Sequence, residues 1–202
     1  MPAARESLLD AAYTALARRP WSAVRMVDVA AAAGVSRQTL YNEFGSKDGL
    51  ARALVRREAD GYLAGVERAL TAHADPRDRL TAAAEWTVAS ARGNPLVRAM
   101  LTGCWGGHLP APALPAAPSG STVPAQRRAD GPLPSPAGFV ALVRDRAAAV
   151  LAGPGAPRSD TAELARSCEL VVRLALSCVA APPADDGVAD LVRGALHRQP
   201  VT

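Results

Sequence analysis

The sequence has few aromatic residues and no isoleucine. Aromatic residues make up 4% of its 202 residues. No run of valine, threonine and aromatic residues alternates with a period of two, as a half-buried strand would require. Hydrophobic residues still make up 49% of the chain, and alanine is abundant. This composition favours closely packed helices around a sizeable core, so we expect an all-α protein.

The sequence also lacks the residue patterns of common catalytic and metal sites. It has no glycine-rich phosphate loop and no nucleophile elbow, and its acidic residues form no evident carboxylate pair. His73, His108 and His197 are far apart, and no pair of cysteines or histidines has the spacing of metal ligands. We therefore expect no catalytic residue, no metal site and no cofactor.

No segment is typical of export or of membrane insertion. The first expected helix contains Arg5, Glu6 and Asp10, which excludes the apolar core of a signal peptide. The longest uncharged stretch, residues 99–126, is interrupted by prolines and would not form a membrane helix. Three scattered cysteines fit a reducing compartment. We expect a cytoplasmic protein.

The charge of the chain permits a nucleic-acid partner without indicating where it binds. The net charge is +4 at pH 7. Residues 1–60 hold nine basic and seven acidic residues, so the excess is not concentrated there. Lys47 is the only lysine among 23 basic residues. Any inference about DNA must therefore come from a motif.

Residues 24–50 contain the most informative pattern in the chain, a short helix followed by a tight turn and a second helix. Val27, Val29, Ala30 and Ala33 are spaced to form one apolar face of the first helix. Gly34 follows directly, and glycine adopts the left-handed conformation that ends a helix without a steric penalty. The pattern predicts a sharp turn at Gly34.

The second helix of this pattern, residues 37–44, offers polar side chains. Ser36 is a good N-cap, and Leu40 and Phe44 are expected to face inward. Arginine reads guanine, glutamine or asparagine reads adenine, threonine offers a methyl and a hydroxyl group, and tyrosine can reach a phosphate. These features predict a helix-turn-helix that reads DNA through Arg37, Gln38, Thr39, Tyr41 and Asn42.

The same residues resemble the N-terminal domain of TetR-type transcriptional regulators. The anchors are Val29-Ala30, Ala33-Gly34-Val35-Ser36, Thr39-Leu40-Tyr41, Phe44 and Ser46-Lys47-Asp48-Gly49-Leu50. Beyond Leu63 the resemblance is one of length and helical layout only. It implies that Ser36 belongs to the DNA-binding set and that Tyr41 and Lys47 contact phosphates.

The chain departs from the family pattern at Arg25. Members often have a threonine there that caps the helix. That cap is therefore either lost or supplied by Ser22, and we expect Arg25 to contact a DNA phosphate instead.

Prolines and glycines mark the expected helix ends and predict nine or ten helices in two domains. Residues 1–48 form the expected three-helix DNA-binding domain, and residues 49–202 a larger helical domain for effector binding and dimerisation. Residues 106–136 hold many prolines, and we expect a mobile loop there. The other expected helices cover residues 7–19, 46–72, 76–92, 95–104, 137–151, 160–180 and 186–197.

The helix expected at residues 160–181 is apolar on most of its sides in its second half. Such a helix must be buried on most sides, and in a small domain a second copy of the chain is the natural cover. We expect a homodimer through this helix and the helix at 186–197, as the resemblance also implies. Such a dimer would read a palindromic operator in double-stranded DNA.

The resemblance implies a pocket for a small molecule among the middle helices. Trp86, Met100, Trp105 and Phe139 are candidates to line it, with ordinary core packing as the alternative. The surrounding residues are apolar, so we expect a small hydrophobic effector. The sequence thus favours a repressor released by an effector. A DNA-binding regulator without a small-molecule input and a helical enzyme or carrier on the same scaffold are the alternatives.

Overall fold

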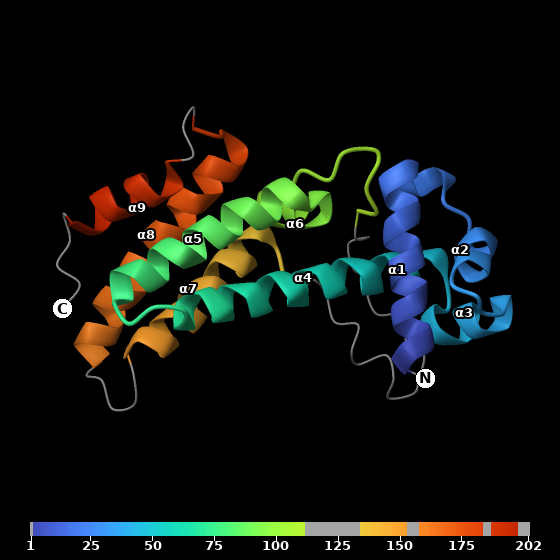
Figure 1. The fold of residues 1–202 in the computed structure, drawn as a ribbon, viewed down its shortest axis with the longest axis horizontal. Helices are drawn as coiled ribbons and strands as arrows, with labels where there is room; N and C mark the ends of the chain where they lie inside the picture. Colours follow the sequence, from blue (N-terminus) through green and yellow to red (C-terminus); the bar gives the residue numbers. More distant parts are fainter. Residues whose placement is uncertain (1, 112–133, 153–157, 184–186, 198–202) are drawn as a thin grey trace, which may run out of the picture. The chain divides into compact units, whose positions relative to one another are not determined.

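The computed structural model of the chain describes residues 2–111, 134–152, 158–183 and 187–197. In these ranges the protein is built from α-helices and one short 3-10 turn, with no strand, as Figure 1 shows. The expected all-α fold is confirmed. The elements are α1 (Pro2–Arg18), η1 (Trp21–Ala23), α2 (Met26–Ala32), α3 (Arg37–Phe44), α4 (Lys47–Thr71), α5 (Pro76–Gly93), α6 (Pro95–Thr102), α7 (Pro136–Ala152), α8 (Arg158–Ala180) and α9 (Val188–His197).

Local capping explains where α5 and α6 begin. Asp75 accepts hydrogen bonds from the N–H groups of Arg77 (2.7 Å) and Asp78 (3.3 Å), and Pro76 occupies the first turn of α5, where it needs no donor. Asn94 ends α5 and caps α6, accepting from Leu96 at 3.0 Å. The predicted boundaries at both positions are confirmed. The proposed caps at residues 185 and 186 lie outside the described residues.

The described chain forms two compact units. The first holds residues 2–58 and 105–111, and the second holds the remaining described residues. The division falls inside α4, after Glu58, and so lies beyond the expected boundary at residue 48. The reason is that the first turns of α4 belong to the first core: Leu50 and Leu54 are fully buried, and Arg57 bonds to Asp10 of α1 at 2.6 Å.

The first residues of the expected mobile loop belong to the first unit. The Trp21 N–H donates to the His108 carbonyl at 2.9 Å, and Pro110 is buried. Residues 106–111 are therefore bound to the helix-turn-helix domain through a backbone hydrogen bond, which no pattern in the sequence predicts. At the other end of the expected loop, α7 already begins at Pro136. Residues 112–133 lie outside the described part.

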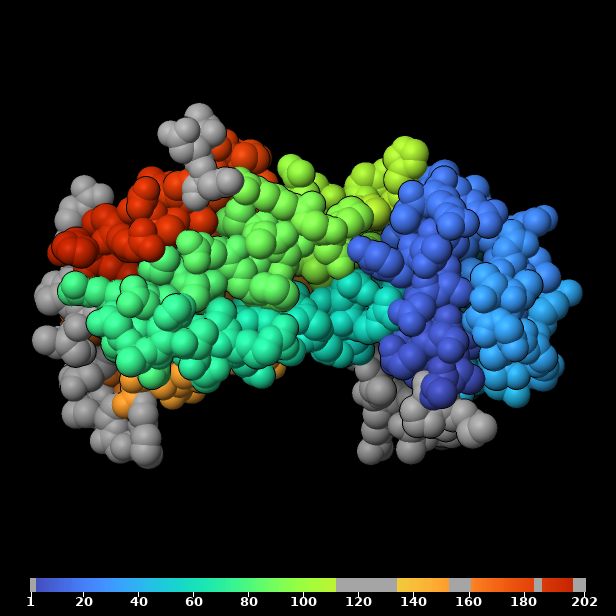
Figure 2. Space-filling view, in the orientation of Figure 1, coloured from blue at the N-terminus to red at the C-terminus, as the bar shows by residue number. Residues whose placement is uncertain are grey.

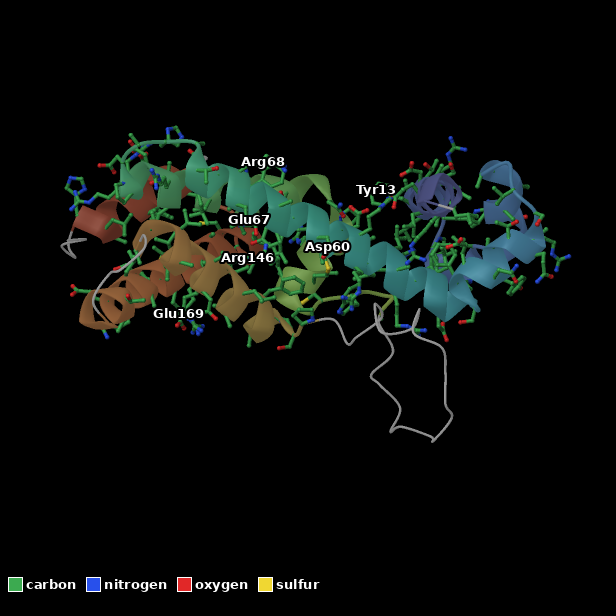
Figure 3. The ribbon with its side chains drawn as sticks, turned by 90° about the horizontal axis from the view of Figure 1, so that it is seen from below. Tyr13, Asp60, Glu67, Arg68, Arg146 and Glu169 are labelled. Atoms are coloured by element: carbon green, nitrogen blue, oxygen red, sulfur yellow. The ribbon has the colours of Figure 1, made fainter. Side chains whose placement is uncertain are left out.

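In the second unit, α5 packs against α6, α8 and α9, and α7 packs along α8. The space-filling view shows α5 and α9 side by side on one face (Figure 2). Ion pairs add to the apolar contacts. Arg146 of α7 meets Glu67 of α4 at 2.6 Å (Figure 3), and Arg144 of α7 meets Glu169 of α8 at 3.5 Å. These pairs are partly exposed, so the buried apolar side chains dominate the stability of the unit.

The subunit buries one side of the helix α8. Val171 and Ala175 are buried, as are Cys168 and Cys178, which behave as the small hydrophobic residues expected of them. Burial raises the pKa of the Cys168 thiol to about 12. Leu164, Leu170, Leu174 and Leu176 are only partly covered within the subunit.

Close packing between α4 and α5 depends on Gly65. A Cβ atom at this position would come within 2.0 Å of the Trp86 ring. The ring cannot easily move away, because Trp86 Nε1 donates to the Tyr62 carbonyl at 3.0 Å. The Tyr62 ring in turn meets Phe139 edge-on, with centroids 6.5 Å apart.

We predict that Gly65→Ala lowers the free energy of unfolding by about 1–3 kcal/mol through overpacking against Trp86. Gly61→Ala is the matched control, because nothing lies within 4 Å of its added Cβ. The control should raise stability by up to about 1 kcal/mol through helix propensity. Urea unfolding followed by tryptophan fluorescence measures both variants, and equal effects would contradict this account of the α4–α5 packing.

Candidate nucleic-acid interface

The turn between α2 and α3 is closed by a left-handed glycine. Gly34 has φ of +68°, and its N–H donates to the Ala31 carbonyl at 3.1 Å. The Val35 N–H donates to the Ala30 carbonyl at 3.0 Å. Together these bonds form a Schellman motif. An added Cβ at Gly34 would meet nothing within 4 Å, so the backbone conformation alone requires glycine here.

The helix α3 begins at a capped serine, as predicted. Ser36 Oγ accepts from the Thr39 N–H at 3.0 Å and shares a hydrogen bond with Thr39 Oγ1 at 2.9 Å. These bonds satisfy a backbone donor that the first turn of a helix leaves free. Ser36 and Thr39 are both predicted to contact DNA, and they also stabilise the N-terminal turn of α3.

The two sides of α3 differ as the sequence predicts. Leu40 is fully buried, while Phe44 is half-buried beneath the Arg5 guanidinium, which lies 4.8 Å from the ring centroid. The opposite side exposes four of the predicted reading residues, Arg37, Gln38, Tyr41 and Asn42. A short capped helix therefore presents polar and cationic side chains to the solvent in the arrangement that major-groove reading needs.

One prediction about α2 is wrong. Val27 was expected to face inward, but its side chain is 41% exposed. Val29 and Ala30 form the buried side of α2. Val27 is two residues before Val29 and lies about 200° away around the helix, so it cannot share that side.

Arg25 forms an ion pair in place of a helix cap. Its Nε and Nη2 donate to the two oxygens of Asp28, each at 3.1 Å, and Arg19 reaches the same carboxylate at 3.2 Å. The Arg25 side chain makes no capping bond to α2, and Ser22 is used through its carbonyl. The cap is lost. Hydrogen bonding from Arg25 is the main cause that holds the pKa of Asp28 below its usual value.

Asp28 is a member of the site that the sequence reasoning missed. The spacing of Arg25 and Asp28, three residues apart at the start of a helix, was the available signal. The Arg25 side chain remains 73% exposed despite the pair. It is therefore oriented by Asp28 and still accessible to a phosphate.

Lys47 connects the start of α4 to the η1 turn. Its Nζ donates to the Ser22 carbonyl at 3.0 Å and lies 5.6 Å from the centre of the Trp21 ring. An ammonium group carries three donors, so this bond leaves others for a phosphate. The predicted DNA contact of Lys47 thus adds to a structural contact within the domain.

Comparison with a family model identifies the domain that carries these residues. Residues 8–54 match the family of bacterial regulatory proteins described as the tetR family. The N-terminal domain belongs to the TetR family. The match covers α1 from residue 8 onward, α2, the turn at Gly34, α3 and the first turns of α4.

Named relatives agree with this TetR-type domain. The HTH-type transcriptional regulator AlkX of Mycobacterium tuberculosis is 51% identical over 69 residues, which are 34% of this chain and 33% of that protein. The HTH-type transcriptional activator FasR of Mycolicibacterium smegmatis is 41% identical over 81 residues, 40% of this chain and 37% of its own length. The chain thus spans about a third of the length of these two relatives.

Solved structures extend the likeness in fold to the whole chain. The TetR family repressor AlkX from Dietzia sp., implicated in biodegradation of n-alkanes, has a TM-score of 0.52 at 24% identity and covers 96% of this chain and 93% of its own. A putative TetR-family regulator from Rhodococcus sp. has a TM-score of 0.56 at 22% identity and covers 98% of both chains. The likeness in fold therefore extends beyond residues 8–54 into the second unit.

The four candidate ligand residues have different surroundings. Met100 and Phe139 are buried in the core of the second unit. Trp86 lines an open pocket of about 410 Å³ between α4 and α5, with the Arg68 guanidinium 5.7 Å from its ring centroid. Trp105 belongs to the first unit. Residue order could not separate these environments, because all four residues are large and apolar.

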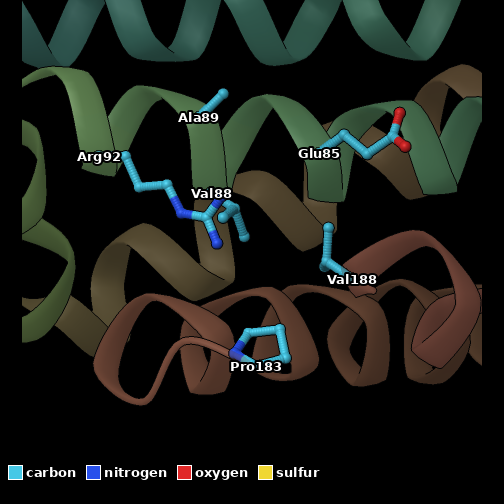
Figure 4. Close-up of a pocket in the computed structure, with 6 residues that line it drawn as sticks. All are labelled: Glu85, Val88, Ala89, Arg92, Pro183 and Val188. Carbon is cyan, nitrogen blue, oxygen red and sulfur yellow. The ribbon is translucent and has the colours of Figure 1, made fainter. Parts of the chain in front are cut away.

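A smaller pocket of about 230 Å³ lies where α5 meets the start of α9. Figure 4 shows Glu85 and Arg92 at its two ends, with Val88 between them and Pro183 and Val188 opposite. Glu85 and Arg92 give the pocket charged ends, and Val88 makes its middle apolar. None of the four predicted ligand residues lines this pocket.

A buried polar pair in the second unit was also missed. Tyr62 is 2% exposed, and its hydroxyl shares a hydrogen bond with Thr87 Oγ1 at 3.2 Å. Burial raises the pKa of Tyr62 to about 12. Phe139 packs against the Tyr62 ring, so this polar pair lies among apolar side chains of the core. Within the described ranges no group of three potential metal ligands occurs, and no helix is long and apolar enough to span a bilayer.

Proposed function

We propose that this protein is a homodimeric DNA-binding transcriptional regulator in the cytoplasm, acting as a repressor that a small hydrophobic molecule releases from a palindromic operator. The observation that carries the proposal is the exposed side of α3. Arg37, Gln38, Tyr41 and Asn42 are held there by a capped helix within a TetR-type domain.

The proposed division of labour follows from the chemistry of these side chains. Arg37 has no partner among the described residues and can donate two parallel hydrogen bonds to guanine. Arg25, Tyr41 and Lys47 are proposed to contact phosphates, which orient the domain without reading sequence. Ser36 and Thr39 cap the N-terminus of α3, which in this proposal faces the DNA.

Dimerisation through α8 and α9 is supported by apolar residues that the subunit leaves uncovered. Leu191 is 48% exposed on α9, and Leu174 of α8 is half-buried. A homodimer with two-fold symmetry would cover both and supply two reading helices for two half-sites. Val171 is not part of this surface, because its side chain is buried within the subunit.

An effector site is proposed in the second unit. Its apolar residues, with Tyr62 and Thr87 as the polar pair, suit a hydrophobic ligand. Of the candidate residues, Trp86, Met100 and Phe139 belong to this unit. Ligand binding would favour one of two conformations that differ in operator affinity.

The DNA-binding proposal predicts distinct effects for two substitutions. Arg37→Ala should cost about 1–3 kcal/mol on the operator and relax base preference at one position per half-site. Lys47→Ala should weaken binding to all sequences and reduce the salt slope by about one. Gel-shift competition at several salt concentrations measures both effects. Arg18→Ala is the control, since it removes an exposed charge outside α3; an equal loss of base preference there would contradict the assignment.

The dimer proposal predicts that Leu191→Arg yields monomers with little operator affinity. Leu191 is 48% exposed in the subunit, so an arginine there leaves the subunit folded. It disfavours the dimer only if the partner covers this position. Leu142→Arg is the matched control on α7, where Leu142 is 36% exposed outside the proposed interface. Sedimentation velocity measures the assembly state, and a Leu191→Arg dimer would exclude α9 from the interface.

The effector proposal predicts that a hydrophobic compound quenches Trp86 fluorescence and releases operator DNA at the same concentrations. Linear alkanes belong in the first screen, because the Dietzia relative is implicated in their degradation. Trp86→Phe should abolish the quenching signal. A regulator without a small-molecule input would keep its DNA in the presence of every compound that binds, and this result would favour the alternative function.

A further inference from the structure

Two side chains on the exposed side of α3 are hydrogen-bonded to each other. Gln38 Nε2 donates to Asn42 Oδ1 at 2.8 Å, and the two residues lie one helical turn apart. Both side chains are exposed. Among the described residues, no other group binds either amide. We call these two residues the amide pair.

The internal bond leaves the amide pair with both kinds of hydrogen-bonding group. A primary amide carries two N–H donors and one oxygen with two lone pairs. The bond to Asn42 uses one N–H of Gln38, so the Gln38 oxygen and the second N–H stay available. A hydrogen bond between two amides uses one donor and one acceptor in either direction, so the pair always keeps at least one of each.

The bond also restrains Gln38. Glutamine has a long side chain that loses much rotamer freedom when a ligand fixes it. A side chain that is already held in one orientation loses less on binding. Asn42 therefore lowers the entropic cost of any contact that the Gln38 amide makes.

Among the bases, adenine complements this arrangement. In the major groove adenine offers the N7 acceptor beside the N6 amino donor, whereas guanine offers two acceptors. Thymine offers one acceptor and a methyl group, and cytosine offers a donor. An amide that keeps both its oxygen and an N–H free makes two bonds to adenine only.

We propose that the amide pair reads one A·T base pair in each half-site. Gln38 contacts the adenine, and Asn42 is a positioning residue that holds the Gln38 amide in place. This inference rests on the proposed function, because it requires α3 to lie in the major groove. In this proposal Gln38 and Asn42 act as one unit that specifies a single base-pair position, instead of reading two positions independently.

The test begins with operators enriched from random duplex DNA by the full-length protein. Competition binding against every single base-pair change in a half-site then gives the preference at each position. We expect wild-type protein to favour A·T at one position by about 5-fold to about 150-fold. Gln38→Ala, Asn42→Ala and the double variant should all lose preference at that same position, and the double variant should lose no more than Gln38→Ala alone.

Two further measurements separate positioning from direct reading. Replacing the adenine by 7-deazaadenine removes the N7 acceptor and should weaken binding of wild-type protein but not of Gln38→Ala. Asn42→Asp keeps an acceptor oxygen for Gln38 and removes the donors of Asn42. This variant should bind all DNA more weakly through charge repulsion yet keep the A·T preference, which a direct contact by Asn42 to the base would not allow.

Tyr41→Phe is the control on the same side of α3 and should weaken binding without changing the preference at any position. Gln38→Ala and Asn42→Ala acting at different positions, or a shared position that is not A·T, would overturn the inference while DNA binding itself stands. Failure of wild-type protein to enrich any duplex would overturn the proposed function as well.

Discussion

A helix of eight residues is too short to be stable in water by itself, and α3 must also leave one side free. The fold meets this constraint through three contacts at α3: the left-handed turn at Gly34, the Ser36 cap and the burial of Leu40. None of the three uses the exposed side chains of Arg37, Gln38, Tyr41 or Asn42. The exposed side chains can therefore be selected for recognition rather than for stability, and the rest of the first unit serves to hold this helix.

Charge around the start of α2 shows how the domain keeps cations exposed and still ordered. Asp28 binds both Arg25 and Arg19, and the hydrogen bonds from Arg25 are the main cause that lowers the pKa of its carboxyl. Lys47 is held by a carbonyl instead of a carboxylate, so its full positive charge remains. In the proposed DNA complex the Asp28 carboxylate would repel nearby phosphates, and the orientation that it imposes on Arg25 would offset this repulsion.

The second unit relies on small residues for its packing. Gly65 lets the Trp86 ring lie directly on α4, and the indole N–H then reaches the Tyr62 carbonyl. The Tyr62 hydroxyl is satisfied by Thr87, so the core contains a polar pair without an unmet donor. By contrast, Leu174 of α8 is only partly covered within the subunit and Leu191 of α9 is 48% exposed, and both belong to the surface on which the proposed dimer depends.

The sequence by itself determined the helical class, most helix boundaries and the two sides of α3. These features depend on neighbours a few residues away: Asp75 and Asn94 cap their own helices, Gly34 needs a positive φ, and Leu40 is the apolar residue in the middle of a polar helix. Local hydrogen bonds and helical periodicity act over such distances, so they are readable from residue order.

Only the tertiary structure decided which apolar residues are covered and which polar groups meet. Val27 is exposed and Val171 is buried within the subunit because neighbouring elements reach one side of each helix and not the other. The bond between Trp21 and His108 joins residues far apart in the chain, and it assigns Trp105 and the following segment to the first unit. The contact of Gly65 with Trp86 likewise depends on how two helices approach. Such contacts are set by the packing of the whole core, which residue order within one element does not encode.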